Sequence, residues 1–132
     1  MGADHTCGVT SSKGQINVGT SKFTQMYVSR LMQVMCAAAD SCMCIMGFLV
    51  SMKRLDLSAK LLAYMYGTDI NMQAFPGIGT KTLMTERAFN SAAGFTAEDD
   101  RLPAYFYTER AKSTGAVFDF TDDEVQNLYQ FV

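Results

Sequence analysis

The chain has 132 residues and is poor in several features that would identify common functions. It has no tryptophan, two prolines and one histidine, and its formal net charge is only −2. This charge gives no electrostatic reason to expect binding to nucleic acid or to an anionic membrane surface. With His5 as the single histidine and no nucleophile elbow, the sequence does not predict a Ser-His-Asp hydrolase site.

Long hydrophobic segments are also missing. The longest apolar run, Cys42–Val50, is far too short to span a bilayer. The first residues, MGADHTCGVTSSKG, have no basic stretch followed by an apolar one, so they do not predict a signal peptide. We therefore expect a cytoplasmic protein. The chain is long enough for one domain with a modest core, and it contains no internal repeat or low-complexity linker.

Three of the four cysteines lie within one short segment. Cys36, Cys42 and Cys44 fall in a helix-like apolar stretch, and Cys7 lies far from them in the sequence. Cysteines on adjacent turns of one helix have poor geometry for a disulfide, so reduced thiols or metal ligation are expected. None of them has C-x-x-C spacing. Three alternatives stay open: small buried hydrophobes, one ligand of a site completed elsewhere, or a thiol redox pair formed by Cys42 and Cys44.

The spacing of apolar residues predicts a mainly α fold. Residues 1–20 read as a loop, residues 21–67 as helices that carry the Asp-Cys segment, and residues 68–132 as further helices. Within the first set, helices are expected at about 21–35, then on to about 52, and at 57–66, where Gly67 would follow the last turn. We treat residues 1–132 as a single helical domain.

The second half of the chain contains clear start and stop signals. Pro76 is expected to kink or end a short helix that begins near Asp69 or Asn71, and Gly77-Ile78-Gly79 is expected to break the helical pattern. A helix from Thr80 to Ala92 would end before Gly94. The GAVFDF segment predicts a short extended piece. The Thr121-Asp122-Asp123-Glu124 sequence is a capping box that opens a last helix.

Two acidic pairs and the methionines offer further candidates. Asp99-Asp100 and Asp122-Asp123 are either metal carboxylates or, more commonly, solvated or helix-capping acids. Five of the ten methionines fall between Met26 and Met46, which indicates an adaptable packed interface. This pattern supports one functional hypothesis, a non-catalytic helical interaction domain with a Met-rich face for a partner.

Three segments together resemble the C-terminal part of the aldehyde:ferredoxin oxidoreductase family, whose members are tungsten- or molybdenum-pterin enzymes. GADH at 2–5 resembles Arg-Gly-Ala-x-His, with Met1 in place of the arginine, and AADSCMCIMGF at 38–48 resembles a segment containing Asp-x-x-Gly-Leu-Cys. The longest match is TERAFNSAAGFTAEDDRLPAYFYTE at 85–109, which resembles Glu-Arg-x-Phe-Asn, Gly-Phe, Asp-Asp-x-Leu-Pro and Phe-x-x-Glu in that order. The resemblance implies a helical C-terminal region of such an enzyme.

The resemblance implies roles for three residues. His5 corresponds to a histidine near the metal that moves a proton, and Asp40 to the aspartate that hydrogen-bonds the pterin. The last ligand of a 4Fe–4S cluster aligns with Ile45, so the adjacent Cys44 is the candidate metal ligand. A shift of one residue turns a helical side chain by about 100°, so ligation by Cys44 requires a local change of backbone.

The implied reaction oxidises aldehydes to carboxylic acids and passes electrons through the 4Fe–4S cluster to ferredoxin. The sequence has no C-x-x-C-x-x-x-C segment for the other three ligands and no N-terminal pterin domain. The resemblance therefore predicts a fragment or split subunit that is inactive or incomplete alone and works with a companion chain or as a homodimer. Whether this chain is itself an enzyme is left open by the sequence.

Overall fold

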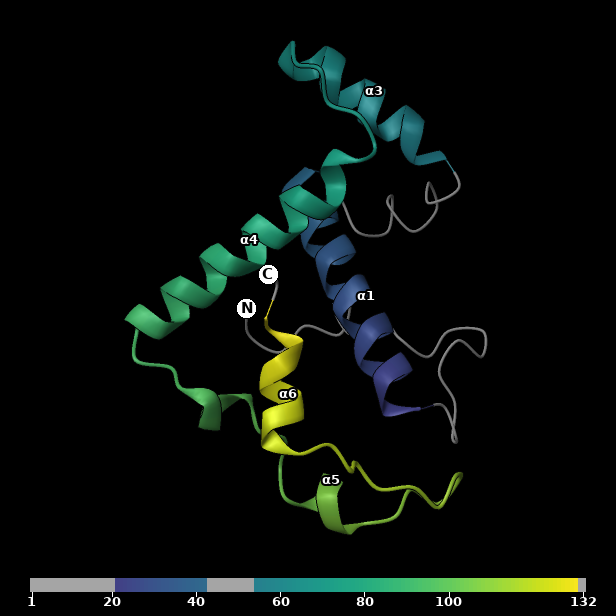
Figure 1. Ribbon diagram of the computed structural model, residues 1–132, viewed down its shortest axis with the longest axis vertical. Helices are drawn as coiled ribbons and strands as arrows, with labels where there is room; N and C mark the ends of the chain where they lie inside the picture. Colours follow the sequence, from purple (N-terminus) through teal and green to yellow (C-terminus); the bar gives the residue numbers. More distant parts are fainter. Residues whose placement is uncertain (1–20, 43–53, 131–132) are drawn as a thin grey trace.

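The computed structural model describes residues 21–42 and 54–130, with backbone only for residues 39–42 (Figure 1). Five α-helices and one 3-10 helix occur in these ranges, and no strand does. This confirms the expected mainly α fold. The elements are α1 (Lys22–Cys42), α3 (Leu55–Tyr66), α4 (Ala74–Ala92), η3 (Ala97–Asp100), α5 (Tyr105–Thr108) and α6 (Asp122–Leu128). None of the described helices is long and apolar enough to cross a membrane.

Helix α1 runs without interruption through the start of the segment that contains the cysteines. The sequence predicted a helix to about Met35 and a second run after it, but α1 continues to Cys42. The small residues Ala37 and Ala38 are fully buried and do not break the helix. They let α1 approach its neighbours closely, so the C-terminal half of α1 forms the centre of the molecule.

Helices α1 and α4 cross at a glycine. A Cβ atom built on Gly79 would lie 1.9 Å from the backbone oxygen of Val34, so only glycine permits this approach. Val34, Ala37 and Leu83 form one buried cluster at the crossing. A second cluster of Ala38, Ala59, Leu62 and Phe75 joins α1 and α4 to α3.

Two expectations about the start of α4 were wrong. Pro76 does not end a helix but lies in the first turn of α4, where its missing N–H costs nothing because first-turn N–H groups have no carbonyl partner within the helix. Gly77-Ile78-Gly79 does not break the helix either, because all three residues lie within α4. Tertiary packing at Gly79 outweighs the low helix propensity of glycine.

The predicted helix start near Asp69 or Asn71 was also wrong, because α4 begins at Ala74, but two other predicted helix boundaries are confirmed. Gly67 follows α3 in the left-handed region, with φ of 63°, and its N–H donates to the carbonyl of Ala63. Thr121 accepts a hydrogen bond from the backbone N–H of Glu124, whose side chain in turn accepts from the N–H of Thr121. The expected GAVFDF extended piece has no regular secondary structure.

Helix α6 lies between the diverging ends of α1 and α4 (Figure 1). It contacts α1 and η3, and none of its residues is fully buried. The fold thus brings α6 beside the segment 85–109, which forms the end of α4, η3 and α5.

Candidate functional site

Of the three predicted site residues, two lie outside the described residues, and only the backbone of the third is described. His5 and Cys44 fall outside the described residues, so their roles stay predictions. The backbone of Asp40 is in the last turn of α1, two residues before the helix ends at Cys42. The structure therefore gives Asp40 a helical position, and its contact with a pterin stays a prediction.

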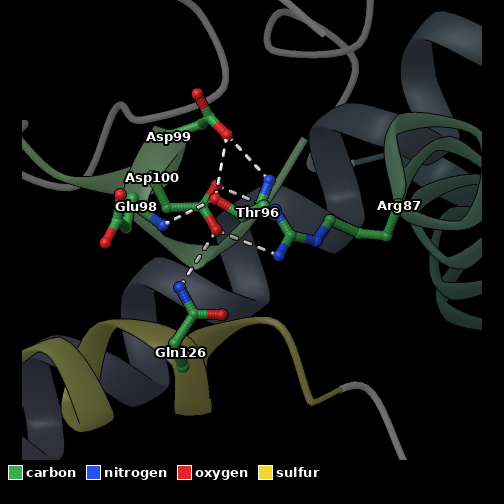
Figure 2. Close-up of polar contacts among 6 residues, drawn as sticks. All are labelled: Arg87, Thr96, Glu98, Asp99, Asp100 and Gln126. Carbon is green, nitrogen blue, oxygen red and sulfur yellow. Dashed lines mark hydrogen bonds and ion pairs between the residues drawn. The ribbon is translucent and has the colours of Figure 1, made fainter. Parts of the chain in front are cut away.

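The segment 85–109 is described in full, and two of its charged residues, Arg87 and Asp100, form the centre of a cluster. Arg87 on α4 donates to both carboxylate oxygens of Asp100 at the end of η3, at 2.8 Å from Nη1 to Oδ1 and 3.0 Å from Nη2 to Oδ2 (Figure 2). A bidentate pair of this kind fixes both the distance and the orientation of its partners. It ties the end of α4 to the Asp-Asp loop that follows it.

Two residues of the C-terminal helix region complete this cluster. The side-chain amide of Gln126 donates to Oδ2 of Asp100 at 3.0 Å, as Figure 2 shows. The guanidinium carbon of Arg87 lies 4.3 Å from the ring centroid of Tyr129, which is a cation–π contact. Arg87 and Asp100 therefore join α4, η3 and the α6 region around one ion pair.

The neighbouring acid, Asp99, has a separate local role. Its carboxylate accepts hydrogen bonds from the backbone N–H of Thr96, at 2.7 Å, and from the Thr96 hydroxyl, at 3.2 Å (Figure 2). The Thr96 hydroxyl accepts from the N–H of Glu98, so a capping box opens η3. The Asp99-Asp100 pair thus divides into a cap and an ion-pair partner.

The cluster changes the pKa values of its members in consistent directions. Partial burial raises the pKa of Asp100, but the hydrogen bonds from Arg87 and Gln126 and the charge of Arg87 outweigh burial, and the net pKa is lowered. The hydrogen bond to Asp100 raises the pKa of Arg87. Burial, followed by the charge of Asp100, raises the pKa of the Tyr129 hydroxyl. At neutral pH the ion pair is therefore fully charged.

This cluster is suited to holding elements together rather than to reacting with a substrate. Both oxygens of Asp100 accept hydrogen bonds, and its side chain is only 14% exposed. Among the residues that the structure describes, no group of three His, Cys, Asp or Glu side chains could hold a metal ion. The metal alternative for Asp99-Asp100 and Asp122-Asp123 accordingly finds no support in the described parts of the fold.

The sequence places Arg87 and Asp100 within one motif but does not predict that they pair. It also gave no role to Gln126 or Tyr129. The available signal was two opposite charges on either side of the turn at Gly94, 13 residues apart. That signal is weak, because many exposed charges have this separation without meeting.

Comparison with known proteins identifies one family. The sequence model described as "Aldehyde ferredoxin oxidoreductase, domains 2 & 3" matches residues 1–132, which is the whole of the sequence. No curated protein and no solved structure matches the chain. The helical fold described above agrees with the helical C-terminal region that the resemblance predicted.

Proposed function

The chain belongs to the aldehyde ferredoxin oxidoreductase family, and from this premise we propose that it forms the C-terminal part of an enzyme that oxidises aldehydes to carboxylic acids and transfers electrons to ferredoxin. The observation that carries the proposal is the match over the whole chain. The ordered cluster of Arg87 and Asp100 supports it, because both residues belong to the motif at 85–109 through which the sequence resembles the family.

Three residues of the chain would serve the cofactors. His5 would hold or release a proton near the substrate, Asp40 would accept hydrogen bonds from the N–H groups of the pterin, and Cys44 would bind iron as a thiolate. When bound, the pterin-held tungsten or molybdenum would supply two-electron chemistry and the 4Fe–4S cluster one-electron transfer. The chain's own contribution is to bind and orient these groups.

The cysteines indicate that a complete cluster requires residues from elsewhere. A 4Fe–4S cluster generally takes four cysteine thiolates, and the sequence has four cysteines in all. Cys36 is only 2% exposed within α1, so it has no open side for a cluster. At most three cysteines are left. We propose that the other ligands and most pterin contacts come from another domain, in a longer polypeptide, a companion chain or a second copy.

The proposed setting is the cytoplasm. A ferredoxin would act as the electron acceptor, as the family name implies.

A second candidate, a non-catalytic helical interaction domain, is favoured by one observation. Helix α3 exposes large apolar side chains, among them Leu57, Leu61, Tyr64 and Met65. The methionines of α1 that suggested this hypothesis, Met26, Met32 and Met35, are half-buried, and Met35 packs against the core. An interaction surface would therefore involve α3 more than the methionines of α1.

Metal analysis separates the two candidates. We would isolate the protein anaerobically, in the form in which it occurs in its host, and measure iron, tungsten, molybdenum and the visible spectrum. The enzyme proposal expects bound metal and a broad thiolate-to-iron band, with iron lost in Cys44→Ser and retained in Cys36→Ala. A folded, colourless and metal-free protein in all of its isolated forms would contradict the enzyme proposal and favour the interaction domain.

A further inference from the structure

The C-terminal segment from Asp119 to Tyr129, here called the acidic strap, has an unusual charge pattern. It contains four acidic residues, Asp119, Asp122, Asp123 and Glu124, and no lysine or arginine. Its helix, α6, contributes no fully buried residue to the core. The apolar side chains of the strap, Phe120, Val125, Leu128 and Tyr129, are only half-buried, so polar contacts contribute much of what keeps the strap between α1 and α4.

The first anchor of the strap is Lys22 at the start of α1. Its ammonium lies 3.2 Å from Oε2 of Glu124 and 3.8 Å from Oδ2 of Asp119, and it donates to the Asp119 carbonyl at 2.5 Å. It also lies 5.3 Å from the ring centroid of Phe120. One cation of α1 thus contacts the beginning of the strap in four ways.

Three arginines hold the rest of the strap. Arg30 on α1 donates to the carbonyl of Asn127, and Nε of Arg101 lies 3.3 Å from Oδ1 of Asp122. Arg87 on α4 lies over the ring of Tyr129. Four basic side chains, which we call the basic row (Lys22, Arg30, Arg87 and Arg101), therefore face an acidic segment.

We propose that the acidic strap is a detachable element that is held on the basic row by charge and leaves it as a unit when ionic strength rises. The side chains of its ion pairs with Lys22 and Arg101 are between 31% and 66% exposed, so dissolved ions can screen them. The α1–α4 crossing is apolar and does not share this sensitivity. Release would uncover the cations of the basic row except Arg87, which loses its contact with Tyr129 but keeps its pair with Asp100.

One contact of the strap is less sensitive to ionic strength than the others. Gln126 donates to Asp100, whose carboxylate is mostly buried and is also held by Arg87. Because the Arg87–Asp100 pair lies within the body and not in the strap, it stays formed when the strap leaves. The strap thus detaches from a body that keeps its own ion pair.

Hydrogen exchange of the full chain, followed by mass spectrometry, tests this inference. We expect amides of residues 119–129 to exchange about three- to tenfold faster in ~500 mM than in ~20 mM NaCl, because screening weakens the ion pairs. Peptides from α4 should exchange at the same rate at both salt concentrations. The proposal would be overturned if the exchange rate of the strap does not depend on salt, or if the exchange rate of α4 changes with salt to the same extent.

A pair of matched variants tests the part played by the basic row. Lys22→Gln removes the first anchor, and Lys112→Gln removes the same charge at an exposed position outside the basic row. We expect Lys22→Gln to speed strap exchange at low salt and to reduce its salt dependence, while Lys112→Gln behaves as the parent chain. Equal effects of both variants would show that the net charge of the protein, and not the basic row, determines the exchange rate of the strap. This test does not depend on the enzyme proposal, because it requires no metal or substrate.

Discussion

Asp100 is the residue on which the described polar contacts converge. Its two oxygens bind the guanidinium of Arg87, and one of them also accepts from Gln126. A carboxylate shared in this way couples a helix, a 3-10 turn and the C-terminal strap. Its loss would leave Arg87 partly buried without its main counter-ion, which costs more than the loss of an exposed pair.

We predict that Asp100→Asn lowers the free energy of unfolding by about 1–2 kcal/mol at pH 7, because a charge-assisted bidentate contact is lost from a partly exposed site. The pKa of Asp100 is lowered in the folded protein. Its contribution is therefore fully present above the unfolded pKa of about 4 and is lost as pH falls through the lower folded pKa. The difference between parent and variant should be constant at neutral pH and should shrink in acid.

Urea unfolding at a series of pH values measures this difference. Asp69→Asn is the control, because Asp69 is exposed and lies far from the cluster in the sequence. A difference for Asp100→Asn that grew on acidification would show that the ion pair has no stabilising role.

At the residue scale, the sequence predicts local contacts and misses distant ones. The Thr121 capping box was predictable because its two partners are three residues apart and need only a helix between them. The Arg87–Asp100 pair was not, because it depends on how the chain turns between α4 and η3. The same holds for Gln126, which is 26 residues from its partner.

At the scale of elements, the crossing of α1 and α4 determines the fold. Two glycines two residues apart on α4 have opposite environments. Gly79 meets the Val34 backbone, whereas a Cβ atom on Gly77 would have nothing within 4 Å. Glycine is therefore required at position 79, whereas at position 77 it only lowers the stability of the helix.

We predict opposite signs for the two alanine substitutions. Gly79→Ala should destabilise the protein by roughly 1–3 kcal/mol, because the clash is with backbone and the helices must move apart. Gly77→Ala should stabilise it by about 0.5–1 kcal/mol through a better helix propensity. Thermal or urea unfolding of the two variants measures both effects. Equal effects of the two would mean that the helices do not cross at Gly79.

This crossing also explains why the start of α4 was mispredicted. Glycine and proline were interpreted through their backbone preferences, which favour a break at residues 76–79. The packing of α1 against α4 rewards a glycine at 79, and the first turn of a helix accepts a proline. Neither condition is visible until the partner helix is known, whereas the ends of α3 and α4 near Gly67 and Gly94 follow from local signals.

At the scale of the whole molecule, the family could be identified from the sequence. The motifs at 2–5, 38–48 and 85–109 led to the family that matches residues 1–132. The structure describes only the last of these motifs fully, and there the residues stabilise the fold. The roles of His5, Asp40 and Cys44 stay predictions, because these side chains lie outside the described residues.

The apolar surface of α3 leads to a prediction for the isolated protein. Leu62 and Ala59 are buried on one face of this helix, while Leu61 is 66% exposed on the other. A helix with apolar residues on both faces is normally covered on both. Exposed apolar surface promotes association, so the isolated chain should self-associate in a concentration-dependent way through α3.

Sedimentation velocity of matched variants tests this prediction. Leu61→Glu should weaken self-association by about tenfold or more, because it replaces an apolar contact with a charge that must be desolvated. Lys60→Gln makes the same change in net charge at an exposed neighbouring position of α3 and should leave self-association unchanged. If both variants weaken it equally, charge and not the apolar face drives association. If the parent chain is a monomer at every concentration, then α3 does not need a covering surface, and the interaction-domain candidate loses the observation that favours it.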